Sequence, residues 1–481
     1  MIKINKNNNL NFFLFIIILI IFILIRFSVL FGEALFEEWL FLNPGINLYA
    51  QNLYILDLGE LSKNSNPFHK PPLTSIIYGF FSNFFYDQLI GARIFSFIVS
   101  IFSFFVLFKI TKSIFALLIF TFSYFFLISA FIIQTDILVL LSFLFFCLSN
   151  NSSNKKLFYY FIILGFLLLW LTKIESAFIC LFCYLIFYLW EKNFKQIIII
   201  IIINLGCVIF SLVFLYFFSC FTKFNFTENL LNIYYPVNRI VSNQFFIFIS
   251  NFNFYILNLV LILKKYIEFN LFSLLILPLS IFYIINFKKI FELIIQQKFF
   301  FIFFIIPFSC YFFLGYSGLQ YPRYYIFSLF SLLIFISKIF NNYINQNKKF
   351  FYIIFLVFFL FNLNLNIKII SNHGNLFISE FGKKEISETL NYNKNFEKIL
   401  TYENFGIYLK NKNIYYWDFI IGYDKNLRTV LQDINKIDAI IIKKSDLEIQ
   451  NIKKILDSYI KLGNIYILEK KNYIVYSRAK I

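Results

Sequence analysis

Three glutamates lie close together in the segment GEALFEEW, directly after the first long apolar run of this 481-residue chain: Glu33, Glu37 and Glu38. If that run spans a membrane, carboxylates at its edge are costly, so each is a candidate site residue. Such a group would act as a general base or would orient an acceptor. The alternative is a solvated helix start, where acidic side chains favour the helix dipole. On a helix, Glu33 and Glu37 would share a face.

Further ionisable residues stand at the ends of later apolar runs. In NPFHKPPL, His69 and Lys70 precede two prolines, which start a helix in the forward direction. Lys70 would hold a phosphate or a substrate carboxylate, or else lie at a polar loop edge. Asp136 in QTD either caps the following helix or points into a shared cavity. Lys173 in LTKIE and Arg323 in QYPRYY lie at the ends of two more runs.

The elements that must position these residues are membrane helices. The chain is 60% hydrophobic and only 14% charged, whereas soluble domains carry about 25% charged residues. A single soluble core stops growing near ~250–300 residues. These properties exclude a soluble enzyme, a disordered chain and a disulfide-stapled secreted domain, and they leave an integral membrane protein with several spans. The net charge of +18 is spread as short basic pairs at the ends of apolar runs, so we expect no nucleic-acid partner.

We expect about 11 to 13 membrane-spanning helices. If two of the candidate runs, 72–85 and 245–263, lie along the outer face instead of spanning, the smaller number holds. The first run follows Lys3 and Lys6 and lacks a cleavage site, so it is expected to be an uncleaved helix with a cytoplasmic N-terminus. The candidate runs are 10–30, 72–85, 94–108, 114–133, 137–148, 157–171, 177–190, 197–221, 245–263, 271–285, 299–314, 324–339 and 350–365.

Loop charge predicts which side of the membrane each loop occupies. With the N-terminus in the cytoplasm, the cytoplasmic loops are short and basic, and nearly all acidic residues of the membrane domain fall outside. Residues 32–90 then form the first extracytoplasmic loop, which is expected to contain juxtamembrane helices. Lys173 and Arg323 also fall outside, against the usual tendency of cations, which favours a specific anion partner such as a lipid phosphate.

A second domain is expected after about residue 370, where charged residues become frequent and apolar runs shorten. Strand patterns at 398–402, 437–442, 465–468 and 473–476 surround a helical stretch at 446–462. This alternation predicts a small extracytoplasmic α/β domain. We therefore divide the chain into a multi-span membrane domain, residues 1–369, and a tail domain, residues 370–481.

The order of the motifs resembles that of the GT-C membrane glycosyltransferases, in particular the bacterial aminoarabinose-lipid and protein O-mannosyltransferase-like enzymes that use polyprenyl-phosphate sugars. The family's acidic pair is usually Asp-Glu, and Gly32 stands here in the place of the Asp. The resemblance covers roughly residues 1–370 and rests on GEALF at 32–36, HKPPL at 69–73, GAR at 91–93, QTD at 134–136, LTK at 171–173 and PRY at 322–324.

The resemblance implies an inverting glycosyltransferase of the cytoplasmic (inner) membrane. It would move a hexose or pentose from a polyprenyl-phosphate donor to an envelope glycan, lipid or protein on the outer side. Glu33 would be the base, with Glu37 and Glu38 as alternatives, and Asp136 would orient the acceptor or a divalent cation. No resident metal site is expected, and a divalent cation is the one cofactor left open. The residues expected to bind the lipid phosphate are Lys70, Lys173, Arg323 and His69.

Two other functions remain open at this point. A flippase or transporter of lipid-linked saccharides would also have many spans and outer cations, although its ionisable residues would be expected at mid-membrane depth. A non-catalytic subunit for envelope assembly is kept open by Gly32, because that residue stands in place of the family's Asp.

Overall fold

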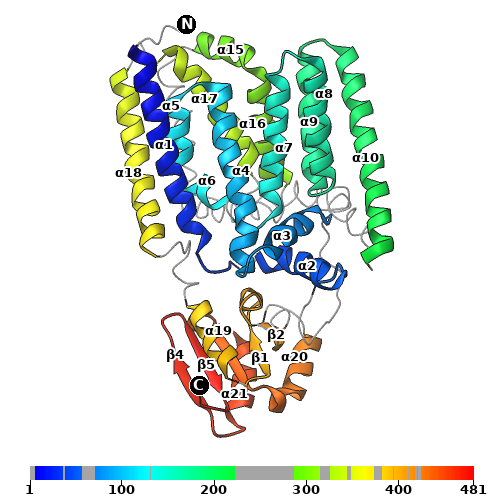
Figure 1. The fold of residues 1–481 in the computed structure, drawn as a ribbon, viewed down its shortest axis with the longest axis vertical. Helices are drawn as coiled ribbons and strands as arrows, with labels where there is room; N and C mark the ends of the chain where they lie inside the picture. The colour runs from blue at the N-terminus through cyan, green and yellow to red at the C-terminus, as the bar shows by residue number, and fades with distance from the viewer. Residues whose placement is uncertain are drawn as a thin grey trace, which may run out of the picture.

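In the computed structural model of the protein, an apolar helical bundle precedes a C-terminal α/β domain (Figure 1). The structure describes residues 6–35, 38–56, 71–129, 132–222, 287–314, 325–343, 348–372, 382–393, 395–409, 412–417, 420 and 424–480. The helices of the bundle within these residues are α1 (Lys6–Leu30), α2 (Glu38–Gln51), α3 (Leu73–Asn83), α4 (Gln88–Thr111), α5 (Ile114–Phe122), α6 (Tyr124–Ser129), α7 (Thr135–Asn150), α8 (Lys155–Trp170), α9 (Ile174–Trp190), α10 (Phe194–Thr222), α15 (Phe287–Gln296), α16 (Lys298–Leu314), α17 (Ile326–Tyr343) and α18 (Lys348–Ser371).

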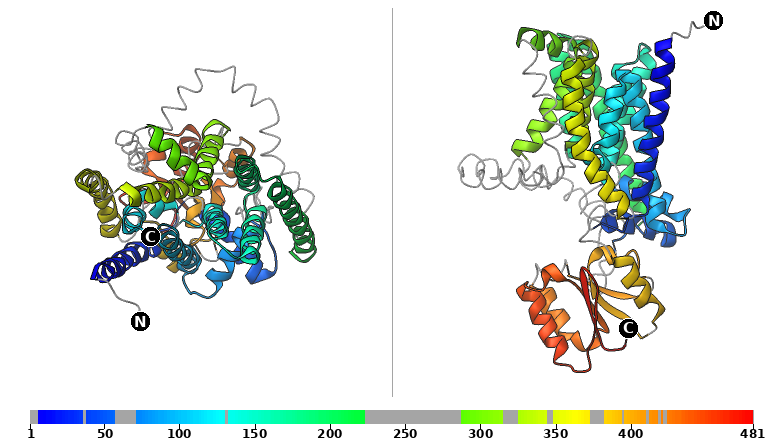
Figure 2. Two further views of the ribbon diagram at one scale, coloured as in Figure 1. Left: turned by 90° about the horizontal axis from the view of Figure 1, so that it is seen from above. Right: turned by 90° about the vertical axis from the view of Figure 1, so that its left-hand side faces the viewer.

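The long apolar helices lie side by side and give the bundle the character of a membrane domain. Three of those described, over 12–30, 88–111 and 194–222, are long and apolar enough to cross a bilayer, and five shorter apolar helices accompany them. The start of α1 and α15 lie at one end of the bundle, whereas α2, α3 and the C-terminal domain lie at the other (Figures 1 and 2). An α-helical membrane protein with a C-terminal α/β domain, as the sequence predicted, is confirmed.

Most of the expected apolar runs coincide with helices, and the differences are informative. The runs 245–263 and 271–285 lie outside the described residues. The polar stretch after α1, within the expected first loop, contains the helix α2, and α15 lies between the expected runs 271–285 and 299–314. The run 114–133 was expected to be one helix, and that prediction was wrong, because the helix is interrupted between α5 and α6.

Local and tertiary contacts explain this interruption. Ser123 has an extended backbone, and its hydroxyl accepts the N–H of Phe126 at 3.4 Å, which makes it an N-cap for α6. Arg26 of α1 donates to two carbonyl oxygens in the last turn of α5, and Asn366 of α18 donates to a third. The amide oxygen of Asn362 accepts the first N–H of α6. Backbone groups freed inside an apolar bundle are costly, and here side chains from two other helices satisfy them.

Helices α2 and α3 cross with their backbones in direct contact at two glycines. A Cβ atom at Gly45 would lie 2.0 Å from the carbonyl oxygen of Ser75, and one at Gly79 would lie 2.5 Å from the carbonyl carbon of Gly45. No side chain other than hydrogen fits at either position. The close crossing fixes α3, and with it the side chains that α3 directs toward the bundle.

We predict that Gly79→Ala destabilises the fold by about 1–3 kcal/mol, because the two helices must move apart to admit the new methyl group. Unfolding of the purified protein in detergent measures the change. Gly206→Ala is the matched control: this glycine also lies within a helix, but a Cβ there would meet nothing within 4 Å. The control is expected to be neutral or slightly stabilising. Equal stability of Gly79→Ala and the unmodified protein would contradict the close crossing.

The C-terminal domain is a five-stranded mixed sheet with order β2-β1-β3-β5-β4. Strand β1 pairs in parallel with β2 and β3, and β5 pairs antiparallel with β3 and β4. The three central strands are mostly buried, and they contribute to a core separate from that of the bundle. The elements of the domain are α19 (Lys383–Tyr392), β1 (Lys398–Thr401), η5 (Glu403–Phe405), β2 (Asn413–Tyr416), α20 (Asp424–Gln432), η7 (Ile434–Lys436), β3 (Ala439–Lys443), η8 (Lys444–Asp446), α21 (Gln450–Ile460), β4 (Tyr466–Glu469) and β5 (Tyr473–Ser477).

Four strand patterns and one helical stretch in the tail were expected from the sequence, and all five are present within a few residues of the expected bounds. Strand β2 and the helices α19 and α20 were missed. In β2 the sequence NIYY shows no clear alternation, because three of its four residues are buried. Helix α18 ends at Ser371, and after Asn372 the next described residue is Gly382.

Candidate functional site

Glu38 and Arg93 form a buried ion pair where α2 meets α4. The guanidinium donates to Glu38 through Nε, 2.9 Å from Oε1, and through Nη2, 2.6 Å from Oε2, so the contact is bidentate. The Glu38 side chain is 0% exposed and the Arg93 side chain is 3% exposed. The carboxylate also accepts the backbone N–H groups of Leu35 and Ile133. Each carboxylate oxygen thus accepts one guanidinium N–H and one backbone N–H. Charge-assisted hydrogen bonds of this kind hold α2 and α4 in one relative geometry.

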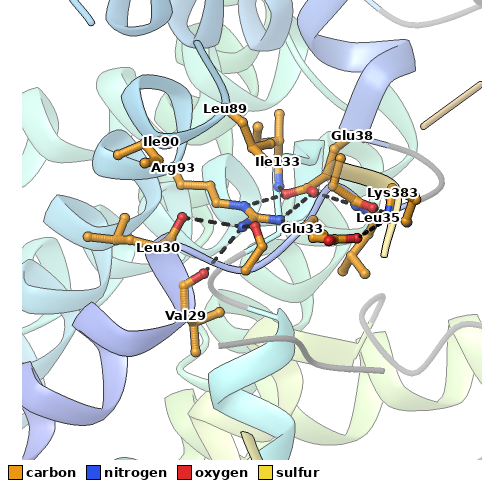
Figure 3. Close-up of polar contacts among 12 residues, drawn as sticks. Val29, Leu30, Glu33, Leu35, Glu38, Leu89, Ile90, Arg93, Ile133 and Lys383 are labelled. Atoms are coloured by element: carbon orange, nitrogen blue, oxygen red, sulfur yellow. Dashed lines mark hydrogen bonds and ion pairs between the residues drawn. The ribbon is translucent and has the colours of Figure 1, made fainter. Parts of the chain in front are cut away.

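Arg93 also fixes the chain segment that joins α1 to α2. Its Nη1 atom donates to carbonyl oxygens of Val29, Leu30 and Gly32, and Nη2 donates to that of Glu33 at 3.0 Å (Figure 3). The carbonyls at the end of α1 lack helical partners, and the guanidinium supplies donors for them. One side chain thus joins the end of α1, the segment after it and the start of α2.

Three polar side chains hold the segment at the start of α7. Glu38 accepts the N–H of Ile133. The hydroxyl of Tyr78, from α3, lies 2.9 Å from that of Ser96 and contacts both the N–H and the carbonyl of Gln134. Asp136 completes the set with its ion pair to Lys173. The start of α7 is therefore bound by α2, α3 and the residue that precedes α9.

Asp136 and Lys173 form the second buried ion pair. The ammonium Nζ lies 2.8 Å from Oδ1, and each side chain is 2% exposed. Asp136 is in the first turn of α7, and Lys173 is the N-cap residue of α9. The sequence left open whether Asp136 caps its helix or points into a shared space. The N-cap residue is Gln134, and the carboxylate reaches across to the neighbouring helix.

The starts of three helices meet beside this pair. The N–H of Leu73, at the start of α3, donates to the carbonyl of Leu171, two residues before Lys173, while Tyr78 of α3 contacts Gln134. None of the N-cap residues of α3, α7 and α9 caps its own helix with a side chain. Helix starts carry partial positive charge. Together with Lys173 they create a local environment that suits an anion.

Glu33 lies in the segment between α1 and α2 and is part of neither helix. Its carboxylate accepts three backbone N–H groups at the start of α19 in the C-terminal domain, those of Gly382, Lys383 and Lys384, at 3.1, 2.8 and 3.4 Å. Gly382 has a φ of 109°, a conformation that residues with a Cβ rarely adopt.

Two tyrosine hydroxyls near the carboxylates, one on the buried Tyr78 and one on the partly buried Tyr408, are uncharged. Burial raises the pKa of Tyr78 on α3 well above that of an ordinary phenol, and the charges of Glu38 and Asp136 raise it further. Burial likewise raises the pKa of Tyr408 in the C-terminal domain. Both side chains therefore contribute neutral hydroxyls at physiological pH.

Not every expected site residue can be placed. Glu37, His69, Lys70 and Arg323 lie outside the described residues. The two prolines that follow Lys70 do start a helix, because Pro72 is the N-cap residue of α3. Among the residues that the structure describes, no group of three or more His, Cys, Asp or Glu side chains could hold a metal ion.

Sequence reasoning missed four residues that organise this region: Arg93, Tyr78, Lys383 and Tyr408. Arg93 belongs to the GAR motif, which by itself assigns no role to its arginine. A charged residue inside an apolar run or at its edge is costly unless it has partners, and this signal includes Arg26, inside the run 10–30, and Arg93, directly before the run 94–108. No comparable signal exists for Tyr78 or Tyr408, because tyrosines are abundant in this chain.

The fold is shared with solved structures of very different sequence. ArnT from Cupriavidus metallidurans in the apo state superposes with a TM-score of 0.59 at 8% identity, over 99% of both chains. ArnT bound to undecaprenyl phosphate gives 0.60 at 10% identity, over 97% of both. ArnT is an aminoarabinose transferase of the GT-C group, so a GT-C-like fold is confirmed.

Other comparisons add no family assignment. An oligosaccharyltransferase from Archaeoglobus fulgidus has a TM-score of 0.47, with 10% identity over 97% of this chain and 73% of its own, too low to establish a shared fold. No protein-family model matches the chain, and no curated protein matches it.

Proposed function

We propose that this protein is a membrane glycosyltransferase that moves a sugar from a polyprenyl-phosphate donor to a cell-envelope acceptor. The observation that carries the proposal is the fold shared with ArnT over nearly the whole of both chains, including a structure with undecaprenyl phosphate bound. Two buried ion pairs lie at the end of the bundle that faces the C-terminal domain. They place ionisable side chains together in this otherwise apolar fold.

Lys173 is the proposed partner of the donor phosphate. Its ammonium has three N–H donors, so it can hold Asp136 with one and a phosphate oxygen with another. Asp136 fixes the position of this cation and makes its burial tolerable. The positive ends of α3, α7 and α9 lie beside it and favour negative charge. His69, Lys70 and Arg323 are proposed as further phosphate contacts from the motifs alone.

The reaction proposed is a single displacement with inversion. The acceptor hydroxyl oxygen forms a bond to the anomeric carbon, while the bond from that carbon to the phosphate oxygen breaks. The hydroxyl proton passes to a carboxylate, and polyprenyl phosphate departs with the negative charge that Lys173 stabilises. Because nucleophile and leaving group lie on opposite faces of the sugar, the base and the phosphate-binding cation must be apart. Asp136 contacts Lys173 directly, so we assign it to positioning that cation.

The first loop supplies the proposed base. Both oxygens of Glu38 are bound by Arg93 and by backbone N–H groups, and both oxygens of Glu33 are bound by the start of α19. The oxygens of these two carboxylates are therefore already engaged by donors that hold the protein together, which leaves them poorly placed to receive the proton of an acceptor hydroxyl. We therefore favour Glu37, one of the alternatives from the sequence, over Glu33 and Glu38 as the proton acceptor.

We also propose the orientation that loop charge predicted, with the N-terminus in the cytoplasm and the C-terminal domain outside. Two observations support it. The start of α1 and the C-terminal domain lie at opposite ends of the bundle (Figure 2). Both buried ion pairs are at the end that carries the C-terminal domain. A donor whose lipid tail stays in the bilayer would present its phosphate at the outer headgroup level.

The test uses the purified full-length protein in lipid nanodiscs and in vesicles. It is incubated with radiolabelled polyprenyl-phosphate hexoses or pentoses and a cell-envelope extract as acceptor. We expect label to move to the acceptor with release of polyprenyl phosphate. Movement of the intact lipid across vesicles without transfer would instead indicate a flippase, and neither activity would indicate an assembly subunit.

A further inference from the structure

The C-terminal domain contacts the bundle through the short segment between α1 and α2. Glu33 accepts three N–H groups from the start of α19, as described above, and acts as the N-cap side chain that this helix lacks in its own sequence, since its N-cap residue is Gly382. A carboxylate at this position satisfies free N–H groups and interacts favourably with the helix dipole.

Two further side chains of the C-terminal domain bind the residue next to Glu33. Lys383 is fully buried, and its ammonium donates to the carbonyl of Ala34. The hydroxyl oxygen of Tyr408 accepts the N–H of Ala34. Both backbone groups of Ala34 are thus bound by the C-terminal domain, a pairing that holds this residue in one position and one orientation.

Apolar and ionic contacts extend the same interface. Ile407 is 8% exposed and belongs to the apolar core of the bundle, unlike the sheet residues, which form their own core. Lys384 lies 3.7 Å from Asp87, the N-cap residue of α4, although both side chains are partly exposed and contribute little. The interface therefore combines a buried apolar contact with several directed hydrogen bonds.

On its opposite side the same segment is bound by the bundle. Arg93 donates to the carbonyls of Gly32 and Glu33, and Glu38 accepts the N–H of Leu35. Figure 3 shows Glu33 and Lys383 beside the Glu38–Arg93 pair. Residues 32–35 are accordingly held between the two domains, and a shift of the C-terminal domain would be transmitted to the pair that orients α2.

We infer that Glu33, Lys383 and Tyr408 are positioning residues through which the C-terminal domain contributes to the active site. They hold residues 32–35 in the position in which Glu38 pairs with Arg93. Glu33 then acts through α19 and not on the substrate. The effect on transfer rests on the function proposed above, whereas the docking of the domain can be measured without any activity.

The experiment measures docking and transfer on the same variants. Spin labels are attached to cysteines at Asn83 and Tyr392, two exposed residues on either side of the interface, after Cys220 and Cys310 are replaced with serine. Electron–electron distance distributions are recorded for the full-length protein in nanodiscs. We expect one narrow distribution that broadens in Glu33→Ala and in Tyr408→Phe, with transfer falling by about tenfold in each, mainly in kcat.

Two further variants make the test selective. Glu385→Gln is the control, because this carboxylate lies in the first turn of the same helix but pairs only at the surface with Lys470. It is expected to change neither readout. Glu33→Asp retains the charge on a shorter side chain and is expected to restore part of the docking lost in Glu33→Ala.

Each remaining outcome overturns the inference in a recognisable way. Loss of transfer in Glu33→Ala with an unchanged distance distribution would mean that Glu33 acts on the substrate. Broadening with full transfer would mean that the C-terminal domain does not position the site. No change in either measurement would make the contact incidental. If the unmodified protein transfers no sugar, the proposed function fails, and the distance measurements still decide whether these residues dock the domain.

Discussion

Lys173→Met is expected to lower glycosyl transfer by about 10²–10³-fold, because it removes the cation proposed to stabilise the departing phosphate. The same variant should bind polyprenyl phosphate more weakly, since the ammonium would contact the donor before the bond breaks. Both quantities are measured with the purified protein in nanodiscs. Transfer at the unmodified rate would exclude Lys173 from the site.

A matched double variant separates this effect from a loss of folding. Lys173→Met alone leaves Asp136, which is 2% exposed, as a buried carboxylate without its cation, and this is destabilising. Lys173→Met combined with Asp136→Asn removes both charges, so its stability should return close to that of the unmodified protein while transfer stays low. Glu191→Gln, which breaks the partly exposed pair with Lys298, is expected to leave transfer unchanged.

Arg93→Met is expected to destabilise the protein by about 3–5 kcal/mol, the usual cost of breaking a buried ion pair. The variant leaves the buried Glu38 carboxylate without its cation and removes the donors for the carbonyls that follow α1. Chemical unfolding in detergent measures the loss. We also expect weaker docking of the C-terminal domain, because residues 32–35 lose their contact with the bundle.

A double variant that removes both charges of this ion pair makes the prediction specific. Combining Arg93→Met with Glu38→Gln removes the uncompensated carboxylate but does not restore donors to the carbonyls of Gly32 and Glu33. Recovery should therefore be only partial, in contrast to the nearly complete recovery expected for Asp136 and Lys173. Full recovery in both double variants would show that the carbonyl contacts of Arg93 contribute little.

The two described glutamates of the first loop have different partners. Glu38 binds the bundle through Arg93, and Glu33 binds the C-terminal domain through α19. The residues of the GEALF and GAR motifs that the structure describes thus lie at the junction of the two domains. Part of the resemblance to the GT-C glycosyltransferases therefore falls on residues that hold the site together.

The sequence by itself determined the class of the protein, the extent of most helices and four of the five strands in the C-terminal sheet. These are local properties: a long apolar run requires a membrane helix, and the alternation of a strand is visible within a few residues. The sequence also located Asp136 and Lys173 at the ends of apolar runs, where ionisable side chains are costly and therefore informative.

Only the tertiary structure decided which charges meet. Glu38 and Arg93 are 55 positions apart, Asp136 and Lys173 are 37 apart, and Glu33 is 349 from the first N–H that it accepts. Glu33 and Glu38 have the same side chain and lie in the same short segment, so local sequence cannot assign them different partners. Local sequence likewise could not predict the interruption of the helix at Ser123. The side chains that bind the free backbone groups there come from the distant helices α1 and α18. The free energy of a buried charge or backbone group depends on neighbours that the packing of distant helices brings to it.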